Sequence, residues 1–153
     1  MKKVFLLILI LITLSGCNKD TKLNLDKIKE KLETLEDNGA LVFNNNTYYD
    51  LDKVTRKYDV DTSEIDKYII SMHTNESNSN LYIIASYKNN KNKLKEELDK
   101  LIDLEKQSFS NGYFPLEYKK VEDHYYKEYG KYLIYIVSDN NELVYQKIIE
   151  EKE

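Results

Sequence analysis

The hydrophobic and polar residues of this 153-residue chain repeat with a helical period in two long stretches. Apolar residues recur every three or four positions from about residue 23 to residue 36, and again from Lys91 to about Ser108, which predicts two amphipathic helices. One side of the second helix carries Leu94, Leu98, Leu101, Ile102 and Glu105. Shorter apolar patterns predict further helices at about 49–58, 115–122 and 142–150.

Four runs of apolar and aromatic residues predict β-strands. They cover Tyr68–Met72, Leu81–Tyr87, His124–Glu128 and Lys131–Ser138. The last run is apolar on both faces, which is typical of a strand inside a sheet. The order of elements predicts one α+β domain: an antiparallel sheet of about four strands with packed helices, arranged ββαββα after an N-terminal helical part.

Local signals predict where these elements end. Asn38-Gly39 is typical of a helix stop. Asp61-Thr62-Ser63-Glu64 has the pattern of a capping box, which predicts a short helix up to about Lys67. Asparagine clusters at 44–46, 75–80 and 89–92 indicate loops.

The N-terminus has the pattern of an export signal. Lys2 and Lys3 precede an apolar run from Val4 to Leu14, which as a helix spans only about 16 Å against a hydrocarbon core of about 30 Å. A signal peptide therefore fits better than a transmembrane anchor.

The end of this segment, Leu14-Ser15-Gly16-Cys17, resembles the lipobox of bacterial lipoproteins. The resemblance implies cleavage between Gly16 and Cys17 and attachment of diacylglycerol to Cys17. Two acyl chains would then hold the protein stably on a membrane. The chain divides on this interpretation into a signal peptide at 1–16, a tether at 17–22 and a single domain at 23–153.

The charge and cysteine content of the mature chain argue against some partners and some kinds of site. Loss of Lys2 and Lys3 leaves 21 of the 23 cationic residues against 27 acidic ones, a net charge of −6. A surface of that sign does not favour nucleic acid. Cys17 is the only cysteine, so an internal disulfide and a thiolate metal site are both excluded.

The candidate chemical groups give no catalytic site. His73 and His124 are the only histidines, and we interpret both as exposed side chains without a role. Asp123 precedes His124, but neighbours on a strand point to opposite faces. The chain has no Gly-x-Ser-x-Gly nucleophile motif, and two separate histidines are too few for zinc. We therefore expect no enzyme activity and no cofactor.

One segment begins like a calcium-binding loop. Residues 59–63 place oxygen-bearing side chains at alternate positions. Glu64 then stands where the loop needs glycine, and Ile70 stands where it needs a bidentate glutamate. Helix capping explains the segment better, and we expect no metal.

Five tyrosines lie within eleven residues: Tyr125, Tyr126, Tyr129, Tyr132 and Tyr135. A tyrosine ring offers a flat apolar face and a polar tip, which suits sugar or peptide ligands. Tyr125, Tyr126 and Tyr129 are therefore the candidate binding surface. The alternative is that these tyrosines are present only because tyrosine favours strands.

From about Leu25 onward the chain resembles a lipoprotein family of Gram-positive bacteria called domain of unknown function 4358. The resemblance rests on the leucine-rich first helix, the segment Tyr-Asp-Val-Asp-Thr-Ser-Glu-Ile at 58–65, the apolar strand pair, the long charged helix, and Gly-Lys-Tyr-Leu-Ile-Tyr-Ile-Val-Ser-Asp at 130–139. It implies a domain attached by lipid to the extracytoplasmic face of the cell membrane. It supplies no catalytic residues.

These observations together favour a non-enzymatic surface lipoprotein, a binding or accessory domain anchored through Cys17. Its partner would be a cell-envelope polymer or a membrane protein. The alternatives are an accessory factor for O-acylation of cell-envelope polymers, to which the family resemblance loosely points, and an enzyme.

Overall fold

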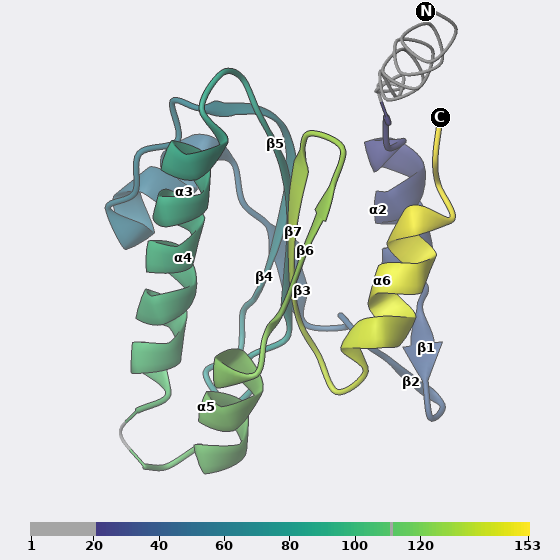
Figure 1. The fold of residues 1–153 in the computed structure, drawn as a ribbon. Helices are drawn as coiled ribbons and strands as arrows, with labels where there is room; N and C mark the ends of the chain where they lie inside the picture. The colour runs from purple at the N-terminus through teal and green to yellow at the C-terminus, as the bar shows by residue number, and fades with distance from the viewer. Residues whose placement is uncertain (1–20, 111) are drawn as a thin grey trace, which may run out of the picture.

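The computed structural model describes residues 21–110 and 112–153, so the predicted signal peptide and Cys17 lie outside the described residues. In this part of the chain a five-stranded sheet lies between two layers of helices (Figure 1). One face is covered by α3 (Leu51–Tyr58), α4 (Lys91–Ser108) and α5 (Pro115–Glu122). The other face is covered by α2 (Leu25–Glu33) and α6 (Asn141–Ile149).

The sheet has the strand order β3-β4-β5-β7-β6, and every neighbouring pair is antiparallel. The strands are β3 (Asn46–Tyr48), β4 (Ile65–His73), β5 (Leu81–Tyr87), β6 (Tyr125–Tyr129) and β7 (Tyr132–Val137). Since β7 lies between β5 and β6, those two strands run parallel and are joined by α4 and α5 in a split βαβ arrangement. The α+β class with an antiparallel sheet is confirmed.

The pleat of the central strands divides the interior into two cores. Ile83 of β5 and Leu133 of β7 point toward α4, whereas Ile84 and Ile134 point toward α2 and α6. Every residue of β7 is buried, which confirms the prediction that this strand lies inside the sheet. The predicted face of α4 is also confirmed, because all five residues assigned to it are buried.

The first helix is shorter than predicted, and the sheet has one strand more. The helix ends at Glu33, and Asn38-Gly39 forms the tip of a hairpin between β1 (Glu36–Asp37) and β2 (Ala40–Leu41). Both tip residues have positive φ, 52° and 79°, the conformation that a two-residue hairpin turn requires. The missed strand, β3, is three residues long and begins inside an asparagine cluster that indicated a loop.

The helix predicted after Asp61 is wrong, because β4 begins at Ile65. The Asp61 carboxylate accepts a bond from the Ser63 backbone N–H at 2.8 Å, which makes a local turn. Glu64 reaches across the fold and accepts bonds from the backbone N–H groups of Asn89 and Asn90, at 3.1 and 2.9 Å. Asp61 also contacts Lys93 of α4 at 2.7 Å, so both acidic residues bind the start of α4 instead of capping a helix of their own.

The two ends of the described chain lie together at one end of the sheet (Figure 1). Leu23 pairs with Lys152 in an antiparallel bridge, and the Glu153 N–H donates to the Lys22 carbonyl at 3.0 Å. Thr21 lies against Gly130 in the β6–β7 turn, so closely that a Cβ on Gly130 would come within 2.8 Å of the Thr21 carbonyl oxygen. We call this end, with Thr21 and Gly130, the tether end. The loops that follow β4 and α4 lie at the opposite, distal end.

Candidate functional site

A pocket of about 540 Å³ opens beside α3 and α4 toward the distal end. Its wall combines charged, polar and aromatic side chains from α3, the end of β4, the C-terminal part of α4 and the loops that follow. The lining residues are Lys57, Tyr58, His73, Glu76, Leu104, Glu105, Ser108, Phe109 and Phe114.

Glu105 is the centre of a buried polar network at the base of this pocket. The residue is only 2% exposed, although it carries a carboxyl group. Its Oε1 accepts a hydrogen bond from the Tyr58 hydroxyl, and its Oε2 lies 2.8 Å from His73 Nε2. Burial of a charge is costly unless partners satisfy it, and His73 and Tyr58 do so here.

The network fixes where the protons of His73 lie. His73 Nδ1 lies 2.9 Å from the Asn75 carbonyl oxygen, which can only accept, so Nδ1 carries a hydrogen. The contact between Nε2 and Glu105 then holds one further proton, and the pair has no net charge. Both ring nitrogens and both carboxylate oxygens are therefore occupied by bonds within the protein.

The pKa of Glu105 reflects opposing effects. Burial acts to raise it, but hydrogen bonds from His73 and Tyr58, together with the charges of His73 and Lys57, outweigh burial. The pKa of Glu105 therefore lies below its ordinary value of 4.5. Burial and the nearby Glu105 charge raise the pKa of Tyr58, so its hydroxyl remains a donor at neutral pH.

Lys57 lies at the mouth of the pocket. Its Nζ is 3.5 Å from Glu105 Oε1 and 4.7 Å from the centre of the Tyr58 ring, and its side chain is 44% exposed. Opposite the charged groups, Phe109 packs on the His73 ring at a centroid distance of 5.5 Å and on Phe114 at 6.5 Å. The pocket thus has a charged base, an ammonium group at its mouth and an apolar wall.

The interpretation of His73 as an exposed side chain is wrong. Only 9% of the residue is exposed, because β4 extends to residue 73 and delivers the ring to Glu105 on α4. His124 is half-buried; its ring stacks on Tyr135 at 5.9 Å, and its Nδ1 lies 3.0 Å from the Val121 carbonyl oxygen. In residues 21–110 and 112–153, no group of three or more His, Cys, Asp or Glu side chains is placed to hold a metal ion.

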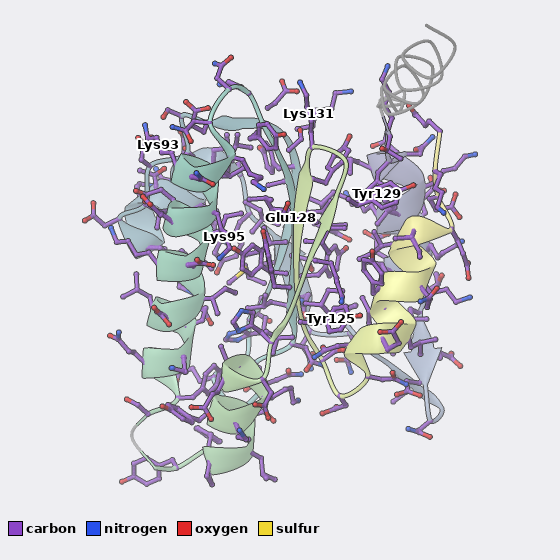
Figure 2. The ribbon with its side chains drawn as sticks, in the orientation of Figure 1. Lys93, Lys95, Tyr125, Glu128, Tyr129 and Lys131 are labelled. Carbon is purple, nitrogen blue, oxygen red and sulfur yellow. The ribbon has the colours of Figure 1, made fainter. Side chains whose placement is uncertain are left out.

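The structure places Tyr126 apart from the other two candidate tyrosines. Tyr126 lies on the α4 face, where its ring packs on Tyr135 at 4.9 Å and its hydroxyl donates to Glu128 at 2.7 Å. Lys95 of α4 lies over the same ring, with Nζ 4.8 Å from its centre. Figure 2 shows Glu128 and Lys95 on this side of β6.

Tyr125 and Tyr129 lie on the opposite face, toward α6 (Figure 2). The Tyr125 hydroxyl donates to Glu142 at 2.6 Å, and Lys152 Nζ lies 5.7 Å from the centre of the Tyr129 ring. Tyr132 and Tyr135 are buried in the two cores, at 4% and 0% exposure. The alternation of β6 therefore prevents Tyr125, Tyr126 and Tyr129 from sharing one continuous patch.

The amino-acid sequence carries one signal of the pocket, although it does not reveal the pocket itself. Glu105 occupies the apolar side of α4, where a carboxylate requires a buried partner. That partner is His73, 32 residues away, with Tyr58 at a separation of 47 residues. The pattern of apolar and polar residues does not indicate which residues so far apart in sequence lie close together in the fold.

Comparison with known proteins gives two matches. The model of a family described as "Domain of unknown function (DUF4358)" matches residues 38–138, a range that contains every residue lining the pocket. A prokaryotic membrane lipoprotein lipid attachment site matches residues 1–18, which include Cys17. No curated protein and no solved structure matches the chain. Among the described residues, no helix is long and apolar enough to cross a membrane.

Proposed function

We propose a binding role for this chain, which belongs to the DUF4358 family and is a membrane-anchored lipoprotein. In this role it is a non-enzymatic domain on the extracytoplasmic face of the cell membrane, acylated at Cys17, and its ligand site is the pocket above Glu105. The single observation that carries the proposal is this pocket, which joins a buried, hydrogen-bonded polar base to an apolar wall. Sites of this composition are typical of small-molecule binding.

The first described residues and the pocket lie at different ends of the domain. Thr21 follows Cys17 by four positions, a reach of about 14 Å when fully extended. The pairing of Leu23 with Lys152 fixes the chain just beyond that point. His73, in contrast, ends the nine-residue strand β4, about 30 Å along the sheet from its start near the tether end. This arrangement supports a domain that holds its pocket away from the membrane.

The bonding of the network supports binding over catalysis. A general base needs a free lone pair within reach of the substrate. His73 uses both ring nitrogens within the protein, and the Glu105 oxygens face Tyr58 and His73. An accessory role in O-acylation of envelope polymers remains an alternative prediction from the family resemblance.

Mass measurement of the intact lipoprotein tests the proposal. The protein would be extracted from its own membranes in mild detergent and analysed by native mass spectrometry. We expect an N-terminal acylated Cys17 and a small-molecule adduct that Phe114→Ala removes. The matched control is Tyr129→Ala, a half-buried tyrosine at the tether end, which should keep the adduct. An adduct unaffected by Phe114→Ala, or its absence from the wild type, would contradict the proposed site.

A further inference from the structure

The side chain of Lys57 lines the pocket and holds its ammonium group beside Glu105, where a cationic ligand could lie in its place. Its ammonium group lies 3.5 Å from Glu105 Oε1, and the Tyr58 and Tyr49 rings are 4.7 and 5.5 Å from Nζ. A carboxylate combined with aromatic rings is the environment in which proteins hold cationic ligands. The position beside Glu105 thus already accepts a primary ammonium group, that of Lys57.

Lys57 makes weaker contacts than Lys120, a lysine that the surrounding residues keep in place. Lys120 is 15% exposed and contacts Glu117, Asp139 and the Asn80 side chain at 3.2, 3.0 and 3.1 Å. Lys57 is 44% exposed, and its single carboxylate contact is longer than any of these three. Because a lysine stem is flexible, Lys57 can leave the pocket for water without moving the backbone.

Departure of Lys57 leaves a position that favours a cation. Glu105 is buried with its Oε1 facing this position, and Glu76 adds a second carboxylate to the pocket lining. An anion in the vacated position would lie beside the Glu105 carboxylate, which is unfavourable in a poorly solvated site. The apolar wall of Leu104, Phe109 and Phe114 would take a hydrocarbon portion attached to the cation.

We propose that the pocket binds its ligand through a primary ammonium group, which replaces the ammonium of Lys57 beside Glu105. The ligand class is therefore an amine that carries an apolar portion. This inference rests on the proposed function, since it names the chemistry of the same site. Lys57 acts as an internal competitor that the ligand must displace.

Removal of the competitor gives a direct test. The full lipoprotein in nanodiscs would be prepared as wild type, Lys57→Ala and Lys53→Ala, and thermal unfolding would be followed during titration with butylammonium chloride. Butylammonium reproduces the whole lysine side chain, from Cβ to Nζ. Lys53 is the matched control, because it lies on the same helix with Nζ 3.7 Å from the centre of the Tyr49 ring. Sodium chloride at equal ionic strength and 1-butanol separate charge from apolar contact.

We expect Lys57→Ala to unfold at a lower temperature and to be restabilised saturably by butylammonium. Its apparent affinity should exceed that of wild type and of Lys53→Ala by at least about fivefold, because Lys57 competes in those proteins. Equal responses of all three proteins, or equal restabilisation by 1-butanol, would overturn the inference. Should Lys57→Ala fail to fold, Lys57→Met keeps the apolar stem and is measured in its place.

The butylammonium titration and the native mass measurement can succeed or fail independently of each other. If the native mass spectrum shows an adduct dependent on Phe114 but butylammonium does not restabilise Lys57→Ala, the amine class is wrong and the binding role stands. Restabilisation without any cellular adduct supports the ammonium site and contradicts the proposed role of the pocket in the cell.

Discussion

The two faces of the sheet bury polar groups in different ways. Beneath α4 the polar centre is a carboxylate, Glu105, with His73 and Tyr58 as partners and a pocket beside it. Beneath α2 and α6 the polar groups are neutral: the hydroxyls of Tyr48 and Tyr82 lie 3.1 Å apart within an apolar core. An unpaired neutral hydroxyl costs less to bury than an unpaired carboxylate, so the α4 face depends more strongly on the partners of its polar centre.

The family match follows the same division. Residues 38–138 include α3, α4, α5 and all five strands of the main sheet, while α2 and α6 lie outside that range. The family model therefore covers the pocket face completely and omits the helices of the other face. The candidate site therefore lies within the part of the chain that the family model matches.

The two faces should differ most in the free energy of unfolding that is lost when the polar centre of each is removed. Glu105→Ala leaves His73 and Tyr58 without their partner and should lower the free energy of unfolding by about 3–5 kcal/mol. Tyr82→Phe, on the other face, removes one neutral hydrogen bond and should cost about 1 kcal/mol. Urea unfolding of both variants measures the contrast, and equal losses would show that the two polar centres do not differ.

Apolar packing, in contrast, should be equivalent on the two faces. Leu98 of α4 and Leu32 of α2 are 2% and 1% exposed. Replacement of either by alanine should lower the free energy of unfolding by about 2–5 kcal/mol, because each creates a cavity in a closed core. A loss below about 0.5 kcal/mol at one position, measured by urea unfolding, would show that its face is loosely packed.

Acid should weaken the α4 face through Glu105. A carboxyl whose pKa is lower in the folded than in the unfolded protein stabilises the fold above the unfolded pKa, and that contribution is lost as pH falls through the folded pKa. The pKa of Glu105 is lowered from 4.5, so the wild type should lose this contribution progressively below about pH 4.5. Glu105→Gln cannot titrate and should show a shallower decline in unfolding free energy, measured at several pH values. An identical decline would mean that Glu105 has the same pKa folded and unfolded.

An exposed carboxylate on the same face should matter least. Glu128 contacts Lys91 of α4 at 2.9 Å, but each side chain is 41% exposed. Glu128→Gln should change the free energy of unfolding by at most about 1 kcal/mol, and 0.5 M salt should reduce the difference. A loss as large as that of Glu105→Ala would show that burial does not set the importance of these carboxylates.

The parts of the fold that the sequence predicted are those with strong local periodicity. The helix α4 matches its predicted bounds, and β7 was recognised as internal because both of its faces are apolar. The failures occurred where distant partners decide the structure. Asp61 and Glu64 suited a helix start locally, yet Glu64 bonds to Asn89 and Asn90 in space.

The candidate site was less predictable than the fold. Glu105 was placed on the buried side of α4, but its partner His73 was interpreted as exposed because β4 was predicted to end at Met72. One further residue of strand brings the imidazole to the carboxylate. The tyrosine cluster was visible in the sequence, but its division between two faces follows from the pairing of β6 with β7.

Ligand binding at the two faces can be compared in one spectrum. Leucine, isoleucine and valine methyl groups of the lipoprotein in nanodiscs would be observed by NMR during titration with butylammonium chloride. We expect saturable shifts of Leu104 in the pocket lining, whereas Val144 and Ile148 of α6 should not shift. Shifts confined to Val144 and Ile148, or the absence of saturable shifts at Leu104, would contradict this expectation.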